Sequence, residues 1–253
     1  AAERKRRSAH AVEVVAVERA TRGSADLAAV LARKSSLKVQ REGGLGSLGR
    51  YSLNGLSGDR VRFFLDGVPL EFTPYQLGVG NVPIGLVDRV EVYQGVVPVQ
   101  FGADALGGAV NLVTDEAVQA NRFGGSYELA SFQTHRLSLA GRVHSPKLRG
   151  FVRANAFADV TANDYAIDAE VFDDSGQVST DRVRRFHDGY RAVGGTLGAG
   201  LVQQSWADRV IAQVYAADDA RDVQHNTGMT VPYGEVTYGR RSLGGNVSYR
   251  KRF

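Results

Sequence analysis

The alternation of polar and apolar side chains after residue 124 restricts the possible fold of this chain more than any other feature. Three segments show it most clearly, each with apolar or small residues at every second position: Leu137, Leu139, Gly141 and Val143; Val152, Ala154, Ala156 and Ala158; Val210, Ala212, Val214 and Ala216. Because successive side chains of a strand point to opposite faces, each segment has one apolar and one polar face. The pattern alone leaves two architectures open, an antiparallel sandwich and a membrane barrel.

The connections between these segments differ in length. Short polar connectors at 145–150 and 202–209 alternate with two longer polar loops, expected from about Val160 to Asp188 and from about Asp218 to Pro232. Short turns at one end and long loops at the other are typical of an outer-membrane barrel, whose strands have roughly 9–11 residues. At this spacing the segment predicts about six strands. We expect the chain to be part of a longer protein, because six strands do not close around a domain.

The N-terminal part predicts a smaller mixed domain. Residues 11–18, AVEVVAVE, have the period of a strand, and Ser24 to Lys34 have the apolar spacing of a helix that buries Leu27, Val30 and Leu31. Ser24 is the expected N-cap, and Asp26 suits the first turn. Period-two runs separated by glycine-rich turns follow as far as Thr114.

Composition argues against several classes of function. The 253 residues include no cysteine, which excludes disulfides, thiolate metal sites and a cysteine nucleophile. The net charge of +4 is scattered, and the single basic run, Arg4 to Arg7, is interpreted as a solvated leader and not as a nucleic-acid site. We find no signal peptide and no apolar run of the roughly 18 residues that a spanning helix needs.

No arrangement of side chains predicts catalysis or metal binding. The five histidines lack the spacing of metal ligands, and the acidic loop Asp159 to Asp174 lacks that of a calcium loop. Gly44 to Gly49, GLGSLG, fits a dinucleotide fingerprint, but a strand-like run follows it where a helix should begin. We therefore expect no enzyme activity, no cofactor and no bound metal.

Two blocks of sequence resemble the plug domain of TonB-dependent outer-membrane receptors. They are RYSLNGLSGDRVRFFLDGVPL, at 50–70, and VDRVEVYQGVVPVQFGADALGGAVNLVT, at 87–114. The second block matches the family pattern at Val90-Glu91-Val92, Gly95, Phe101-Gly102, Gly107-Gly108, Asn111 and Thr114, and the first matches at Gly55 and at Leu65-Asp66-Gly67-Val68. The resemblance covers roughly residues 11–114.

The resemblance implies a mainly β fold, in which a small α+β plug is followed by the first six or so antiparallel strands of a barrel. The expected organisation is a leader or linker at 1–10, the plug at 11–114, a linker at 115–123 and an incomplete barrel at 124–253. The family barrel has about 22 strands, and the plug fills its lumen. Small residues would allow the plug backbone to lie close to the wall.

The resemblance also suggests which residues carry the function. The apical plug loops would be Gly43 to Gly49 and Glu71 to Gly80. The candidate ligand contacts there are Leu45, Ser47, Phe72, Tyr75 and Gln76. The residues expected to latch or pack the plug are Asn54, Gly55, Asp66, Gly67, Glu91, Gln94, Gly95, Gly102, Gly107, Gly108 and Asn111.

The chain departs from the family at the expected latch. The family usually has arginine at the positions of Asn54 and Gln94, and proline at that of Val96. The resemblance implies that those arginines pair with barrel glutamates. We hypothesise that the barrel partners of the two amides are neutral in this protein, since an ion pair that loses one partner is destabilising.

The implied function is energised uptake of a scarce ligand, such as a siderophore–iron complex or a vitamin, across the outer membrane of a Gram-negative cell. The implied partners are TonB, a small-molecule or metal-chelate ligand and outer-membrane lipid, with no nucleic acid. The alternative is a soluble or periplasmic β-rich module for ligand binding or signalling, derived from a plug. Detergent dependence separates the two, because the exposed strand edges and apolar face of a barrel segment do not tolerate water.

Overall fold

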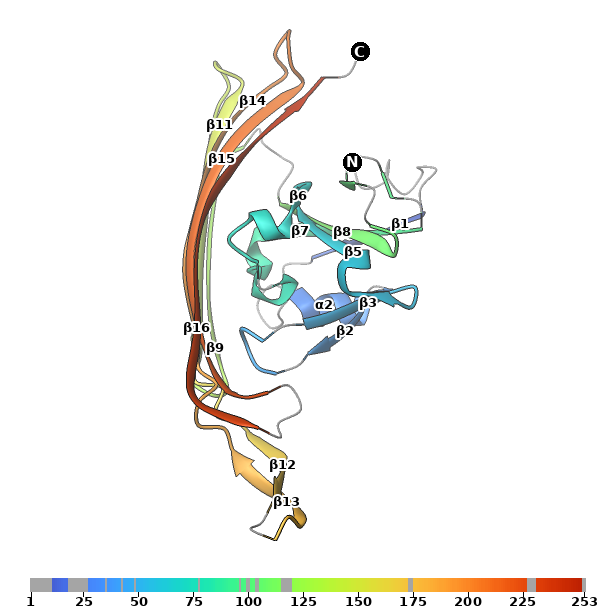
Figure 1. Cartoon of the computed structure of the whole chain (residues 1–253). Coiled ribbons are helices and arrows are strands. Elements are labelled where there is room, and N and C mark those ends of the chain that lie inside the picture. The colour runs from blue at the N-terminus through green and yellow to red at the C-terminus, as the bar shows by residue number, and fades with distance from the viewer. Residues whose placement is uncertain are drawn as a thin grey trace.

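The computed structural model describes residues 11–17, 27–34, 36–41, 43–47, 49–76, 78–95, 97–98, 101–102, 105–114, 120–172, 175–226 and 231–251. Two parts are visible in Figure 1: an N-terminal lobe, residues 11–114, and a tall curved sheet beside it. The lobe lies against the concave face of the sheet. Among the described residues, no helix is long and apolar enough to cross a membrane.

The N-terminal lobe is built on a mixed five-stranded sheet. Its order is β1 (Ala11–Ala16), β7 (Val87–Gln94), β8 (Gly108–Thr114), β5 (Val61–Leu65) and β6 (Val68–Pro69), with β5 and β8 parallel and the other pairs antiparallel. A three-stranded sheet of β2 (Lys38–Arg41), β3 (Gly49–Leu53) and β4 (Leu56–Ser57) accompanies it. Short 3-10 helices lie at Gly58–Arg60, Leu70–Phe72, Val79–Asn81 and Ile84–Leu86.

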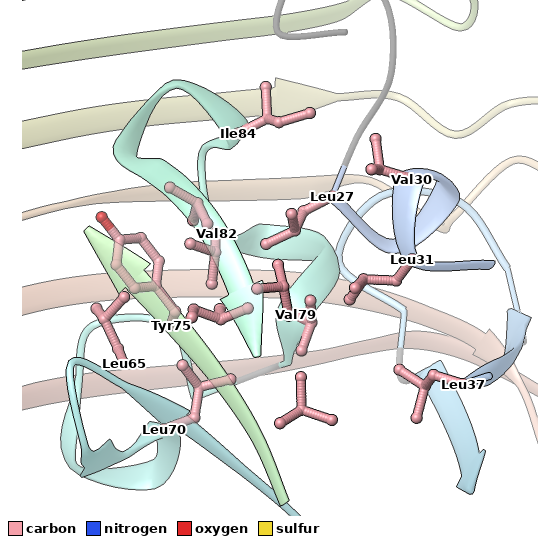
Figure 2. Packing of buried hydrophobic residues seen from close by; sticks show 14 of the residues in the cluster. Leu27, Val30, Leu31, Leu37, Leu65, Leu70, Tyr75, Val79, Val82 and Ile84 are labelled. Atoms are coloured by element: carbon pink, nitrogen blue, oxygen red, sulfur yellow. The ribbon is translucent and has the colours of Figure 1, made fainter. Parts of the chain in front are cut away.

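The single described α-helix, α2 (Leu27–Lys34), packs its apolar stripe into the core of the lobe. Leu27, Val30 and Leu31 are buried, as the sequence predicts, and Figure 2 shows Leu27 and Leu31 directed toward Val79. The expected cap, Ser24, and Asp26 lie outside the described residues. Strands β7 and β8 are buried along most or all of their length, because one face, with Val90 and Leu112, belongs to the main hydrophobic cluster and the other, with Tyr93 and Ala109, belongs to a second cluster.

The lobe contains two tight hairpins. Leu53 pairs with Leu56, and Leu65 with Val68, so each hairpin has a two-residue loop. Those loops are Asn54-Gly55, with φ of 53° and 79°, and Asp66-Gly67, with φ of 52° and 84°. Both central residues have positive φ, which is the type I′ turn that Asn-Gly and Asp-Gly sequences favour.

The curved sheet, called the wall below, contains six antiparallel strands. In chain order they are β9 (Arg122–Ala130), β10 (Thr134–Ser145), β11 (Gly150–Thr161), β14 (Tyr190–Val202), β15 (Arg209–His225) and β16 (Pro232–Arg250), and each pairs with the next. This confirms the six predicted strands. All six belong to one curved sheet, so the sandwich alternative is not the fold of the described residues.

The two long loops of the sequence prediction have different outcomes. The connection after Thr161 is long and carries a hairpin of its own, β12 (Ala166–Phe172) and β13 (Val178–Arg184). The second predicted loop, from Asp218 to Pro232, is wrong in extent, because β15 continues to His225. Its charged residues are compatible with a strand because Asp218 and Asp219 lie opposite Arg241 and Arg240 of β16 and pair with them.

Candidate functional site

The two faces of the wall have opposite chemistry. The outer face carries exposed apolar side chains, among them Leu243 with 84% exposure, and also Phe123, Leu139, Val152, Leu197, Val214 and Val247. The inner face carries polar and charged side chains, and several of them are buried, including Asp159 and Arg142. A sheet that is apolar outside and polar inside matches a wall between lipid and a filled lumen.

An ion pair joins the lobe to the wall at the second hairpin. Arg153, on the inner face of β11, donates from Nη1 to Asp66 Oδ2 at 3.0 Å and to Thr114 Oγ1 at 3.1 Å. Asp66 Oδ2 also accepts the Thr114 hydroxyl at 2.6 Å, and Oδ1 accepts the Thr114 N–H at 2.9 Å. The side chains of Asp66 and Arg153 are 13% and 20% exposed, so the pair is largely shielded from solvent.

The same hairpin connects to a polar network inside the lobe. Asn111 Oδ1 accepts the Gly67 N–H at 2.9 Å, and Asn111 Nδ2 donates to Glu91 Oε2 at 3.3 Å. Glu91 is fully buried, and Arg89 and the Tyr93 hydroxyl also donate to its carboxylate. The carboxylate is thus paired and hydrogen-bonded, which a buried charge requires.

The first apical loop packs closely against the wall at the end that carries the long loop. Asn163 Nδ2 donates to the Leu45 carbonyl at 2.9 Å, and Arg221 donates to the Gly46 carbonyl at 3.4 Å. A Cβ at Gly44 would lie 2.1 Å from Asn163, and one at Gly46 would lie 2.3 Å from the Tyr190 ring. Gly46 also has a φ of +80°, so both space and backbone conformation require glycine there.

The second apical loop is anchored through Tyr75. Its ring lies 5.1 Å from that of Phe157, and its hydroxyl donates to Asn155 Oδ1 at 3.2 Å. Tyr75 is only 1% exposed, and burial, together with the charge of Asp159, raises the pKa of its phenol, against a smaller lowering by Arg136. Nearby, Arg136 contacts the Gly80 carbonyl at 3.5 Å and pairs with Asp159. This loop is therefore attached to the wall by aromatic packing and hydrogen bonds.

The five predicted ligand contacts differ in accessibility. Phe72 is 58% exposed, whereas Leu45, Ser47 and Gln76 are half-buried. Ser47 donates its hydroxyl to the Gly44 carbonyl at 2.7 Å, which shapes the loop. In this structure the Tyr75 ring has no exposed surface to offer a ligand, so it packs the interface. Ligand contact at these positions stays a prediction.

The predicted latch and packing residues fall into two groups. Asp66, Gly67, Glu91 and Asn111 converge in the network described above. The others lie elsewhere: Asn54 and Gly55 form the first hairpin turn, Gln94 donates to Ser36 within the lobe, Gly95 and Gly102 have positive φ, and Gly107 and Gly108 lie against backbone and leucine side chains. A Cβ at Gly108 would be 2.4 Å from the Tyr93 carbonyl. Val96 lies outside the described residues.

A cavity of about 620 Å³ separates part of the lobe from the wall. Asp66, Thr114 and Leu86 line it from the lobe, and Arg153, Gln213 and the inner faces of β9 and β10 line it from the wall. Among the described residues, no group of three His, Cys, Asp or Glu side chains is placed to hold a metal ion. The cavity is therefore lined by both polar side chains, such as Asp66 and Arg153, and apolar ones, such as Leu65 and Leu86.

Sequence reasoning did not identify Arg153 as a partner of the lobe, or Gln213 as the residue that holds Arg153 on the wall. Arg153 lies between Val152 and Ala154 in the alternating pattern, which predicts only that it belongs to the polar face of its strand. The available signal was its place on the polar face of a strand expected to surround a plug, which does not specify which lobe residue it meets.

Comparison with known proteins gives matches to one family. Residues 4–109 match the family model described as the TonB-dependent receptor plug domain. The vitamin B12 transporter of Vibrio vulnificus (strain CMCP6) is 31% identical over 85 residues, which are 34% of this chain and 14% of that protein. The vitamin B12 transporter of Vibrio cholerae is 29% identical over 117 residues, 45% of this chain and 19% of that protein. The chain therefore spans less than a fifth of the length of these relatives in the aligned regions.

Solved structures share the fold of both the lobe and the wall. A ferric enterobactin receptor mutant from Pseudomonas aeruginosa superposes with a TM-score of 0.64 at 14% identity, covering 99% of this chain and 40% of the receptor. The arrangement of a lobe on the concave face of a curved sheet thus has a direct parallel in proteins of known structure.

Proposed function

We propose, on the premise that residues 4–109 are a TonB-dependent receptor plug domain, that this chain is the plug and adjoining wall of an outer-membrane transporter. The observation that carries the proposal is the placement of the lobe on the polar face of a sheet whose opposite face is apolar. Such a protein would take up a scarce ligand with energy transmitted by TonB. It would move the ligand without bond chemistry.

The outer face of the wall supports a lipid environment. Exposed apolar residues recur on it from β9 to β16, and at the end with the short turns the exposed Tyr249 donates its hydroxyl to the backbone carbonyl of the exposed Trp206. Outer-membrane barrels place aromatic girdles at the membrane interfaces. A soluble module would leave this apolar face in water, which soluble proteins avoid over areas beyond a few hundred Å².

We propose the ligand by chemical class only. The relatives named above are a vitamin B12 transporter and a ferric enterobactin receptor, so a vitamin or an iron–siderophore complex is the proposed cargo. Leu45, Ser47, Phe72 and Gln76 are the proposed contacts on the apical loops, and Tyr75 would position the second loop. The plug domain at 11–114, the linker at 115–123 and the barrel portion at 124–253 are the proposed divisions.

Cysteine labelling of the full-length protein in a Gram-negative host tests this topology. The chain has no cysteine, so Gln177→Cys, at the tip of the β12–β13 hairpin, and Lys147→Cys, in the short turn between β10 and β11, are unique sites within it. Long loops of outer-membrane barrels face outward and short turns face the periplasm. We expect a membrane-impermeant maleimide to label the Gln177→Cys protein on intact cells. The Lys147→Cys protein should be labelled only after the outer membrane is permeabilised.

The unsubstituted full-length protein is the control for cysteines elsewhere. Equal labelling at both positions on intact cells, or recovery of the protein in the soluble fraction without detergent, would refute the membrane assignment. A second arm measures uptake of cyanocobalamin and of ferric enterobactin in strains with and without TonB. Uptake of a probe that is unaffected by loss of TonB would contradict energised transport.

A further inference from the structure

We propose that Arg153 is a positioning residue whose ion pair with Asp66 holds the second hairpin of the lobe against the wall, beside the cavity. This pair would separate during transport. The inference rests on the proposed function and deepens it. The resemblance implies a latch in which the plug supplies arginines and the barrel supplies glutamates. In the pair proposed here the lobe supplies the carboxylate and the wall supplies the arginine.

The carboxylate of Asp66 is fixed on the lobe before Arg153 is considered. The type I′ turn sets its backbone, and both groups of Thr114, the N–H and the hydroxyl, bond its two oxygens at 2.9 and 2.6 Å. Asn111 holds the next residue, Gly67, through its backbone N–H. A carboxylate with this support stays in place when the arginine leaves.

The guanidinium of Arg153 is likewise fixed on the wall. Its Nη2 donates to Gln213 Oε1 at 2.8 Å, two strands away on β15. The position between them on β14 is Gly198, where a Cβ would lie 3.2 Å from the Gln213 Cβ and 3.6 Å from the Arg153 Cγ. Glycine thus leaves the space in which the arginine side chain lies across the neighbouring strand.

Separation of this pair leaves both partners with hydrogen bonds. Asp66 keeps Thr114, and Arg153 keeps Gln213, so neither becomes an isolated buried charge. The pair between Arg89 and Glu91 differs, because it lies wholly within the lobe with side chains only 8% and 0% exposed. The Asp66–Arg153 contact is therefore suited to repeated opening, whereas Arg89–Glu91 is suited to holding the lobe together.

The position of the pair connects it to the cavity. Asp66, Thr114, Arg153 and Gln213 all line the space of about 620 Å³ between lobe and wall. Opening the pair frees the hairpin from the wall at the border of this space. The expected consequence is a wider gap between the lobe and strands β9 to β11.

The test uses the full-length protein with Asp66→Asn, Arg153→Gln and the double variant. Asparagine tolerates the left-handed turn conformation and still accepts a bond from Thr114, so the fold is retained. Hydrogen exchange of the purified protein in detergent, read at residues 61–69 and 108–114, measures attachment of the hairpin. We expect each single change to raise exchange there about tenfold, as loss of a charge-assisted hydrogen bond implies.

The double variant tests coupling. Because the two side chains act on one contact, it should exchange no more than about threefold faster than either single variant. Arg182→Gln is the matched control, since its pair with Asp168 is on the exposed hairpin with side chains 73% and 62% exposed. Exchange in either single variant equal to that of the control, or effects that multiply in the double variant, would overturn the proposal.

Antibiotic susceptibility of cells measures whether loss of the pair lets large molecules pass through the barrel of the full-length protein. In a strain without TonB, cells with Asp66→Asn or Arg153→Gln should admit vancomycin, a large antibiotic, and be inhibited at a concentration several-fold below that for wild type. If both vancomycin susceptibility and hydrogen exchange of the variants equal those of wild type, the proposed role of the Asp66–Arg153 pair is rejected, while the outer-membrane assignment is unaffected. If the protein is absent from the outer membrane, the proposed function fails, whereas the exchange comparison in detergent still judges the pair.

Discussion

The lobe and the wall have the same period of alternation but place their apolar residues in opposite directions. In the lobe, β7 and β8 bury apolar side chains such as Val90 and Leu112 completely. In the wall, the corresponding apolar side chains face outward, and Leu243 and Val247 are 84% and 73% exposed. A period-two pattern therefore identifies a strand but not which side is solvent. That information comes from what lies against each face.

The two parts also treat charge differently. The lobe encloses Glu91 at its centre, with three side chains donating to it. The wall arranges its charges in pairs between neighbouring strands on the face that meets the lobe, as in Arg136–Asp159 and Asp219–Arg240. The stability of the lobe would thus depend on a few buried polar groups. The stability of the wall would depend on the lipid or water that contacts its outer face.

Removal of the central carboxylate of the lobe should have the largest effect. Glu91→Ala removes the carboxylate to which Arg89, Tyr93 and Asn111 donate, and breaking a buried ion pair typically destabilises a protein by about 3–5 kcal/mol. Denaturant titration of the full-length protein, followed by hydrogen exchange at β7 and β8, measures the loss. Glu71→Ala is the control, because the Arg62–Glu71 pair has side chains 29% and 50% exposed and should change stability by less than about 1 kcal/mol. Equal losses for the two variants would contradict the contrast between buried and exposed charge.

A charge on the outer face of the wall should have the next largest effect. Leu243→Arg places a guanidinium where the proposal puts lipid, at about 2–4 kcal/mol near the bilayer midplane. Ser242→Arg, one residue earlier on the same strand, points to the inner side and is the matched control. Unfolding of the full-length protein from lipid vesicles gives the free energies. A larger loss for Ser242→Arg would reverse the assignment of the two faces.

Close approach at the apical loop should give the smallest difference. Gly46→Ala and Gly55→Ala both put a side chain at positive φ, +80° and +79°, which costs about 1–2 kcal/mol. Only Gly46 lies against another side chain, the Tyr190 ring, whereas no other heavy atom lies within 4 Å of a Cβ at Gly55. We expect Gly46→Ala to destabilise the docked lobe by roughly 1 kcal/mol more, through overpacking. Hydrogen exchange at residues 43–47 measures this destabilisation. Equal effects of the two substitutions would show that the loop moves away from Tyr190 without a cost in stability.

The sequence predicts the elements of this fold well where periodicity decides them. The helix that buries Leu27 and Leu31 and the six wall strands follow from spacing alone. The extension of β15 through Asp218 and Asp219 does not, because adjacent carboxylates resemble a loop until their arginine partners on β16 are known. Strand pairing supplies those partners, and it is not visible from one strand.

The site is only partly predictable for the same reason. The motif residues Asp66, Glu91 and Asn111 are identifiable within the sequence, and the structure brings them into one network. Asn54 occupies a hairpin turn, which the Asn-Gly sequence favours, and its role in a latch stays a prediction. Arg153 is 87 residues from Asp66 along the chain, and no local pattern connects them.

The empty position at Gly198 has a consequence for the alignment of strands. Side chains alternate across β14, so a slip of one residue in its pairing would turn Leu197 or Ala199 toward Arg153 and Gln213. A Cβ at this position would already be tight against the Gln213 Cβ, at 3.2 Å, and the longer leucine side chain would compete with the arginine for the space over the strand. The register that places glycine here therefore also favours the contact between Arg153 and Gln213, from which the arginine reaches the hairpin.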